Sequence, residues 1–67
     1  MTRNTKENKV NVYVGSLETA TVIKHCNAKR NLRYIGTDMN CVYNNKDVWA
    51  HVYEDPEGNC YAVIEDI

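Results

Sequence analysis

The sequence predicts a small single domain of the α+β class, with one helix packed on one face of a mostly antiparallel four-stranded sheet. Residues 10–14 alternate strictly between valine and other side chains, which indicates a strand with one buried side. Residues 16–28 place apolar side chains at helical spacing, and residues 48–65 alternate again on both sides of a turn. The expected order is therefore β-α-β-β-β over residues 9–67, in a chain of 67 residues that has room for one domain.

The N-terminal residues 1–8 are polar and show no periodicity. They predict a disordered arm. In the strand that follows, the valines at positions 10, 12 and 14 are expected to point inward, and Gly15 ends the strand.

The helix is expected to begin at Ser16 and to end near residues 27–28. Ser16 is a good N-cap, and Glu18 lies in the first turn, where the helix dipole favours a carboxylate. One stripe at helical spacing holds Thr19, Val22, Ile23 and Cys26. Several of these residues are β-branched, which lowers helix propensity, so a strand is the alternative for this segment.

Three further strands are expected after a basic connector at residues 29–31. The first covers residues 32–43 and is interrupted at residues 36–38 by a bulge or a tight turn. Residues 44–47 form a hairpin turn, because asparagine tolerates the left-handed conformation and aspartate favours turns.

The last hairpin has the clearest turn chemistry. Pro56 at the second turn position and Gly58 at the left-handed position suit a type I turn closed by a G1 bulge. We therefore expect Asp55 to face Asn59, Tyr53 to face Tyr61, and His51 to face Val63. The inner face of the sheet would then hold Val10, Val12, Val14, Met39, Cys41, Val48, Ala50, Val52, Cys60, Ala62 and Ile64.

The net charge of −1 hides an asymmetry, since residues 1–33 carry +5 and residues 34–67 carry −6. The two halves either neutralise each other within the fold or form two poles that steer a charged partner. The three cysteines are odd in number and not closely spaced, with no signal peptide before them. This pattern favours free thiols in a reducing compartment, so we expect a cytoplasmic protein.

No metal, no cofactor and no catalytic residue is expected. The possible metal ligands have none of the close spacings that begin a zinc site; they are His25, Cys26, Cys41, His51 and Cys60. On a helix, adjacent side chains diverge by about 100°, which separates His25 from Cys26, and no nucleophile elbow is present. Residues 15–17 link a strand to a helix start but lack a glycine-rich phosphate motif. The chain is therefore predicted not to be an enzyme.

The outer face of the last hairpin is the predicted binding site. A small domain builds one core, so a second face rich in tryptophan and tyrosine is typical of an interface. The expected contact residues are Trp49, His51, Tyr53 and Tyr61, with an acidic rim at Glu54, Asp55 and Glu57. We expect a protein partner and a homo-oligomer, most simply a homodimer, and no membrane, since no apolar run approaches the roughly 20 residues of a membrane span.

These observations predict a non-enzymatic protein-binding domain. Its small size and its many residues with AT-rich codons fit a phage or mobile-element accessory protein. One form is an inhibitor that occludes a surface of a host defence complex, as an anti-CRISPR protein does. The alternative is a nucleotide- or nucleic-acid-binding protein that uses stacked aromatics and the basic residues around the connector; its residues would be Lys24, Lys29, Arg30, Arg33 and Tyr34.

Overall fold

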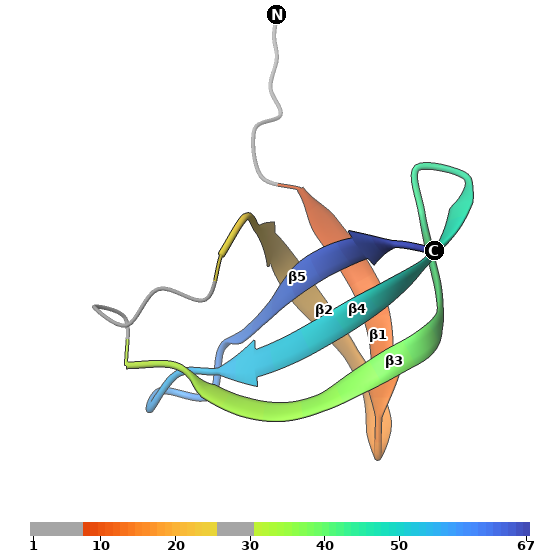
Figure 1. The fold of residues 1–67 in the computed structure, drawn as a ribbon. Coiled ribbons are helices and arrows are strands. Elements are labelled where there is room, and N and C mark those ends of the chain that lie inside the picture. Colours follow the sequence, from red (N-terminus) through yellow and green to blue (C-terminus); the bar gives the residue numbers. More distant parts are fainter. Residues whose placement is uncertain (1–7, 26–30) are drawn as a thin grey trace, which may run out of the picture.

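A computed structural model describes residues 8–25 and 31–67 of the chain, and every regular element within these ranges is a β-strand. The strands are β1 (Lys9–Val14), β2 (Ser16–Ile23), β3 (Arg33–Tyr43), β4 (Lys46–Glu54) and β5 (Cys60–Asp66). They form one sheet in the order β1-β2-β5-β4-β3. The sheet curls into a half-barrel, in which the β1–β2 hairpin crosses behind the other three strands (Figure 1).

The predicted α+β class is wrong, because the fold is all-β. The segment expected to begin a helix at Ser16 is the strand β2, and the predicted helix end near residues 27–28 lies outside the described residues. The β-branched residues decide the outcome, since their side chains are stiff in a helix and pack well on a pleated sheet. Ala20 is buried opposite Val10, whereas Thr19 of the expected helical stripe is exposed. The strand alternative for this segment is confirmed.

The β1–β2 hairpin covers the inner side of the other three strands, where the helix was expected (Figure 1). β1 is the strand predicted, with Val10 and Val12 buried and Val14 partly buried. Gly15 reverses the chain between Val14 and Ser16 with a φ of 84°, a conformation that glycine adopts without strain. Of the predicted arm, only Asn8 is described, and its carbonyl accepts a hydrogen bond of 2.8 Å from the Val22 amide.

The remaining strands form an antiparallel meander that β2 joins in parallel. β2 pairs with β5 at Thr21, Val22 and Ile23, whereas the β3–β4 and β4–β5 pairs are antiparallel. β5 therefore lies between β2 and β4 although it is the last strand in the chain.

The open question at residues 36–38 is answered by two bulges in a continuous β3. The pairing with β4 shifts register between Tyr34 and Gly36 and again between Asp38 and Cys41. Bulges of this kind bend a strand and increase its twist. Gly36 is also a point of close approach, because a Cβ atom there would lie 3.1 Å from Cγ1 of Val14.

The bent β3 meets β1 along a seam that closes one side of the half-barrel. The Tyr13 amide donates a hydrogen bond of 2.9 Å to Oδ2 of Asp38. The Cys41 thiol donates to the Asn11 carbonyl at 3.7 Å. Among the described residues, these contacts replace a regular ladder between the two strands.

The core lies between the hairpin and the meander. It consists of Val10, Val12, Ala20, Cys41, Val48, Ala50, Val52 and Ala62, with Val14, Val22, Tyr43, Cys60 and Ile64 packed against it. Met39 was expected to point inward but is 60% exposed, because it lies in the second bulge of β3. Ala20 is the buried residue that the helix prediction concealed.

Both hairpin turns of the meander follow the predicted chemistry. Asn44 and Asn45 have φ values of 55° and 62° between the paired residues Tyr43 and Lys46, which is typical of a type I′ turn. The observed turn is shorter than the predicted turn at residues 44–47, because Lys46 already belongs to β4. The β4–β5 hairpin has the predicted register, with Tyr53 opposite Tyr61 and His51 opposite Val63. The described part of the chain holds no helix long and apolar enough to cross a bilayer.

Candidate functional site

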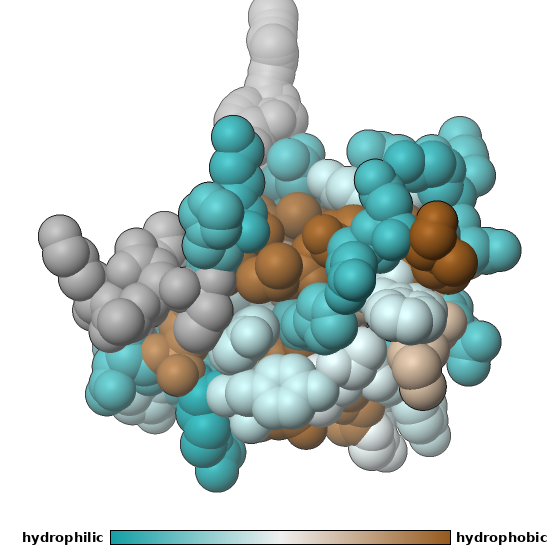
Figure 2. Space-filling view, viewed as in Figure 1, coloured by the Kyte–Doolittle hydropathy of each residue, from teal (hydrophilic) through white to brown (hydrophobic). Residues whose placement is uncertain are grey.

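The candidate site is the outer surface of β3, β4 and β5, which we call the aromatic face. It consists of Tyr34 from β3, Trp49, His51 and Tyr53 from β4, and Tyr61 from β5. None of the described strands covers this side of the meander. Figure 2 shows side chains of intermediate hydropathy gathered over β3 and β4, with both hydrophilic and hydrophobic side chains beside them. Tyr34 and Trp49 are 54% and 36% exposed, so both can touch a partner.

A hydrogen-bonded network runs across the aromatic face over three strands. The Tyr34 hydroxyl bonds to Oγ1 of Thr37, and the same oxygen lies 2.9 Å from Nδ1 of His51. On the other side of the imidazole, Nε2 lies 2.7 Å from Oε1 of Glu65. The network therefore links β3 to β5 through one histidine of β4.

The chemistry of the groups fixes the direction of these bonds when the imidazole is neutral. An ionised carboxylate only accepts hydrogen bonds, so Nε2 of His51 carries the proton and donates to Glu65. Nδ1 is then an acceptor, and the Thr37 hydroxyl donates a hydrogen bond to it. The Thr37 oxygen in turn accepts a hydrogen bond from the Tyr34 hydroxyl.

The tyrosines on this face are also ordered by direct contact. The rings of Tyr34 and Tyr53 are cross-strand neighbours, with centroids 5.4 Å apart and planes at 61°. This edge-to-face arrangement is a favourable one for aromatic pairs. Side chains held in this way lose little conformational freedom when a partner binds.

The network contains the residue types of a hydroxyl nucleophile, a base and an orienting carboxylate. Thr37, His51 and Glu65 stand in that order. However, acyl transfer also needs donors for an oxyanion and a hollow for the substrate. Two surface hollows of about 420 and 370 Å³ lie beside the β4–β5 turn, and neither is lined by Thr37 or His51.

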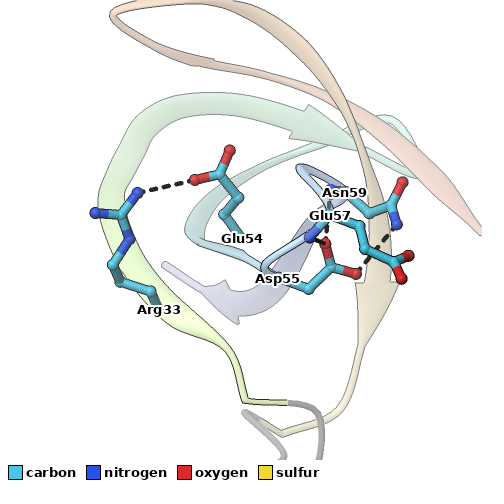
Figure 3. Close-up of polar contacts among 5 residues, drawn as sticks. All are labelled: Arg33, Glu54, Asp55, Glu57 and Asn59. Atoms are coloured by element: carbon cyan, nitrogen blue, oxygen red, sulfur yellow. Dashed lines mark hydrogen bonds and ion pairs between the residues drawn. The ribbon is translucent and has the colours of Figure 1, made fainter.

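At the tip of the β4–β5 hairpin, Asp55 organises the turn. Oδ1 accepts hydrogen bonds from the amides of Glu57 and Asn59 at 3.0 and 2.9 Å (Figure 3). Oδ2 accepts from Nδ2 of Asn59 at 3.1 Å and from the Tyr61 hydroxyl at 3.2 Å. These bonds, led by the backbone bond from Asn59, lower the pKa of Asp55. Of the predicted acidic rim, Asp55 thus has a role within the turn, while Glu57 is exposed.

The third rim residue, Glu54, forms an ion pair of 3.0 Å with Arg33, as Figure 3 shows. Of the alternative anion-binding set, Lys24 follows β2, and Lys29 and Arg30 lie outside the described residues. Of the described residues of this set, the structure therefore brings together only Arg33 and Tyr34, which are already adjacent in the sequence. Arg33 already has a carboxylate partner, which weakens the case for a phosphate ligand.

The described residues hold no group of three His, Cys, Asp or Glu side chains that could bind a metal ion. Burial raises the pKa of the Cys41 thiol, and the charge of Asp38 adds to the effect. Burial also raises the pKa of Cys60, with further contributions from the carboxylates of Glu18, Glu54 and Asp55. A thiol with a raised pKa is a poor nucleophile and a poor ligand at neutral pH.

The structure brings the four predicted contact residues Trp49, His51, Tyr53 and Tyr61 onto one face. It adds Tyr34, which the sequence had assigned to the alternative site. Thr37 and Glu65 were missed, because their place beside His51 depends on the pairing of three strands. Alternation at Glu65 puts it on the outer face, and this was the available signal.

No family model matches this chain, and no curated protein or solved structure is significantly similar to it. Its function therefore has to be argued from the aromatic face itself.

Proposed function

We propose that the protein is a non-enzymatic protein-binding domain and that the aromatic face is its contact surface. The observation that supports this most directly is an ordered group of four aromatic rings and a histidine on a sheet face that no described strand covers. Tryptophan and tyrosine dominate binding energy at protein interfaces. The core on the opposite face is complete without them.

The charges around the aromatic face favour a basic partner surface. The cations of the meander are already paired, Arg33 with Glu54 and Lys46 with Asp66 at 3.3 Å. Glu57 is exposed at the tip, and Glu65 lies on the face itself. Opposite charges across an interface guide association and exclude wrong partners.

Basic surfaces of this kind occur in complexes that hold nucleic acid. An acidic, aromatic domain that occupies such a surface would act as an inhibitor of a host defence complex in the cytoplasm, comparable to an anti-CRISPR protein. This role, like the phage origin and the homodimer, remains a prediction from the sequence. The nucleotide-binding alternative is less well supported, because carboxylates around the face repel phosphate.

The proposal is tested by capture with the full-length chain. Wild type, Trp49→Ala and Leu17→Ala would be immobilised, with folding checked by circular dichroism, and exposed to nuclease-treated bacterial lysate. Leu17 is a matched control, because it is an exposed apolar residue on β2, outside the aromatic face. We expect Trp49→Ala to lose a protein that wild type and Leu17→Ala both retain.

Light scattering over a range of concentrations separates self-association from binding of a foreign protein. A wild-type oligomer that becomes a folded monomer in Trp49→Ala would place the aromatic face between two copies of the chain. If Trp49→Ala keeps both the oligomeric state and the captured proteins of wild type, the proposed contact surface is wrong.

A further inference from the structure

We propose that the aromatic face anchors an arginine side chain of its partner, with the guanidinium over Trp49 and paired with Glu65. This inference rests on the proposed protein-binding function and adds the chemistry of the group that is recognised. It depends on three features of the face: where Trp49 and Glu65 lie, how Glu65 is held, and which hydrogen-bonding groups point outward.

Trp49 and Glu65 are directly opposite each other in the β4–β5 ladder. Side chains in such a pair have Cβ atoms about 4.5–5.5 Å apart, so a single guanidinium can reach both. Trp49 is 36% exposed and the Glu65 side chain is 54% exposed. The pair therefore offers an aromatic ring and a carboxylate side by side to an approaching cation.

The Glu65 carboxylate is oriented before any partner arrives. Its Oε1 atom receives the hydrogen bond from His51, and the ring of His51 is held from the other side by Thr37. This leaves Oε2 without a donor among the described residues. A carboxylate fixed in this way binds a donor with a smaller loss of conformational entropy than a free side chain.

The hydrogen-bonding groups that the network leaves for a ligand are acceptors, whereas the Trp49 indole N–H beside it is a donor. With His51 neutral, every hydrogen-bond donor of the network is used by another member of the network. Oε2 of Glu65 and the lone pairs of the Tyr34 hydroxyl therefore remain as acceptors for a ligand. A guanidinium has five donors and no acceptor, and its plane stacks on an aromatic ring. A lysine ammonium lacks that plane, and a phosphate would be repelled by the Glu65 carboxylate.

The full-length chain can be tested with two peptides, one with two arginines among glycines and one with lysines in the same places. Trp49 is the only tryptophan, so fluorescence reports on this site alone, and the Trp49 indole N–H can be followed by NMR. We expect the arginine peptide to bind about two- to fivefold more tightly than the lysine peptide, the range for an exposed cation–π contact.

The matched variants are Glu65→Gln and Glu18→Gln, which remove the same charge on the aromatic face and at an exposed position of β2 outside it. We expect Glu65→Gln to weaken arginine-peptide binding about two- to fivefold and Glu18→Gln to leave it unchanged, with both variants folded by NMR. Equal binding of the two peptides, no binding of either, or an equal loss in both variants would overturn the inference.

The failure of this inference can be told apart from the failure of the proposed function. If Trp49→Ala loses the captured protein but the arginine preference is absent, the contact surface stands and its anchor is not an arginine. If the arginine preference depends on Glu65 while Trp49→Ala captures the same proteins as wild type, the site binds guanidinium but is not the protein contact.

Discussion

The two sides of β4 show how this small domain divides its side chains. Val48, Ala50 and Val52 point inward and have no exposed surface, whereas Trp49, His51 and Tyr53 alternate with them on the outer side. The largest fully buried side chains are valine and cysteine. The free energy gained by burial grows with apolar area. The rings on the outer side contribute little of this free energy to folding, but a partner that covers them would gain it on binding. The inner side of β4 therefore serves folding, and its outer side is free to serve binding.

The largest effect on stability should come from the inner side. Val52→Ala removes two carbon atoms from a position with no exposed surface and should cost about 2 kcal/mol of unfolding free energy, through lost burial and a small cavity. Denaturant unfolding followed by Trp49 fluorescence measures this. Val42→Ala, at a 60% exposed position of β3, is the control and should change stability by less than about 0.5 kcal/mol. Equal losses would contradict the division between the two sides.

The seam between β1 and β3 should have the next largest effect, because it closes the layer that the inner side packs against. Asp38 accepts the Tyr13 amide and also the Asn40 amide, at 2.9 Å each. Asp38→Ala should cost about 1–2 kcal/mol, the range for hydrogen bonds to a charged group that is partly exposed. Asp47→Ala, an exposed aspartate of β4, is the control. Hydrogen exchange of the Tyr13 amide should rise in Asp38→Ala alone.

The outer network should contribute less than one buried valine. A double-mutant cycle of Thr37→Val and His51→Ala should give a coupling free energy of about 0.5–1 kcal/mol, the net value of one exposed hydrogen bond. Urea unfolding of the four proteins measures it. A coupling as large as the loss in Val52→Ala would show that the aromatic face is needed for folding rather than left free for a partner.

The smallest effect should come from the hairpin tip and should depend on pH. The pKa of Asp55 is lowered from the ordinary value of an aspartate by bonds that only the folded state makes. The ionised form therefore stabilises the fold above this value, and the stabilisation is lost as pH falls through the lower pKa of the folded state. Asp55→Asn should lower the thermal midpoint at pH 7, and its difference from wild type should shrink at pH 3 and below. Glu57→Gln should show no such convergence.

How much of the fold the sequence predicts depends on how local the deciding contacts are. The β4–β5 hairpin is correct in register because Pro56, Gly58 and the alternation beside them lie within one short segment. The sequence predicts a helix in place of β2 because Ser16 and Glu18 are good helix-start residues. What holds it extended is pairing with β1 and with β5, and β5 lies some forty residues further along the chain.

The site was half predictable for a similar reason. Alternation alone put Trp49, His51 and Tyr53 on one face. The network was hidden because a regular ladder continuing from Tyr34 and Tyr53 would pair Thr37 with Ala50. The extra residue in the first bulge moves Thr37 opposite His51 instead. No local pattern shows where a bulge will fall.

The central position of β5 has a consequence for how the chain is made. The β1–β2 hairpin emerges from the ribosome before the meander, but its ladder of backbone pairing with the meander is made only with β5, the last of the five strands in sequence order. Until then its outer edge at Thr21–Ile23 has no neighbour in the sheet, and exposed edges of this kind recruit other chains. Contacts between strands far apart in sequence also form slowly. For this domain, the interval before β5 has emerged is therefore a period of increased risk of aggregation.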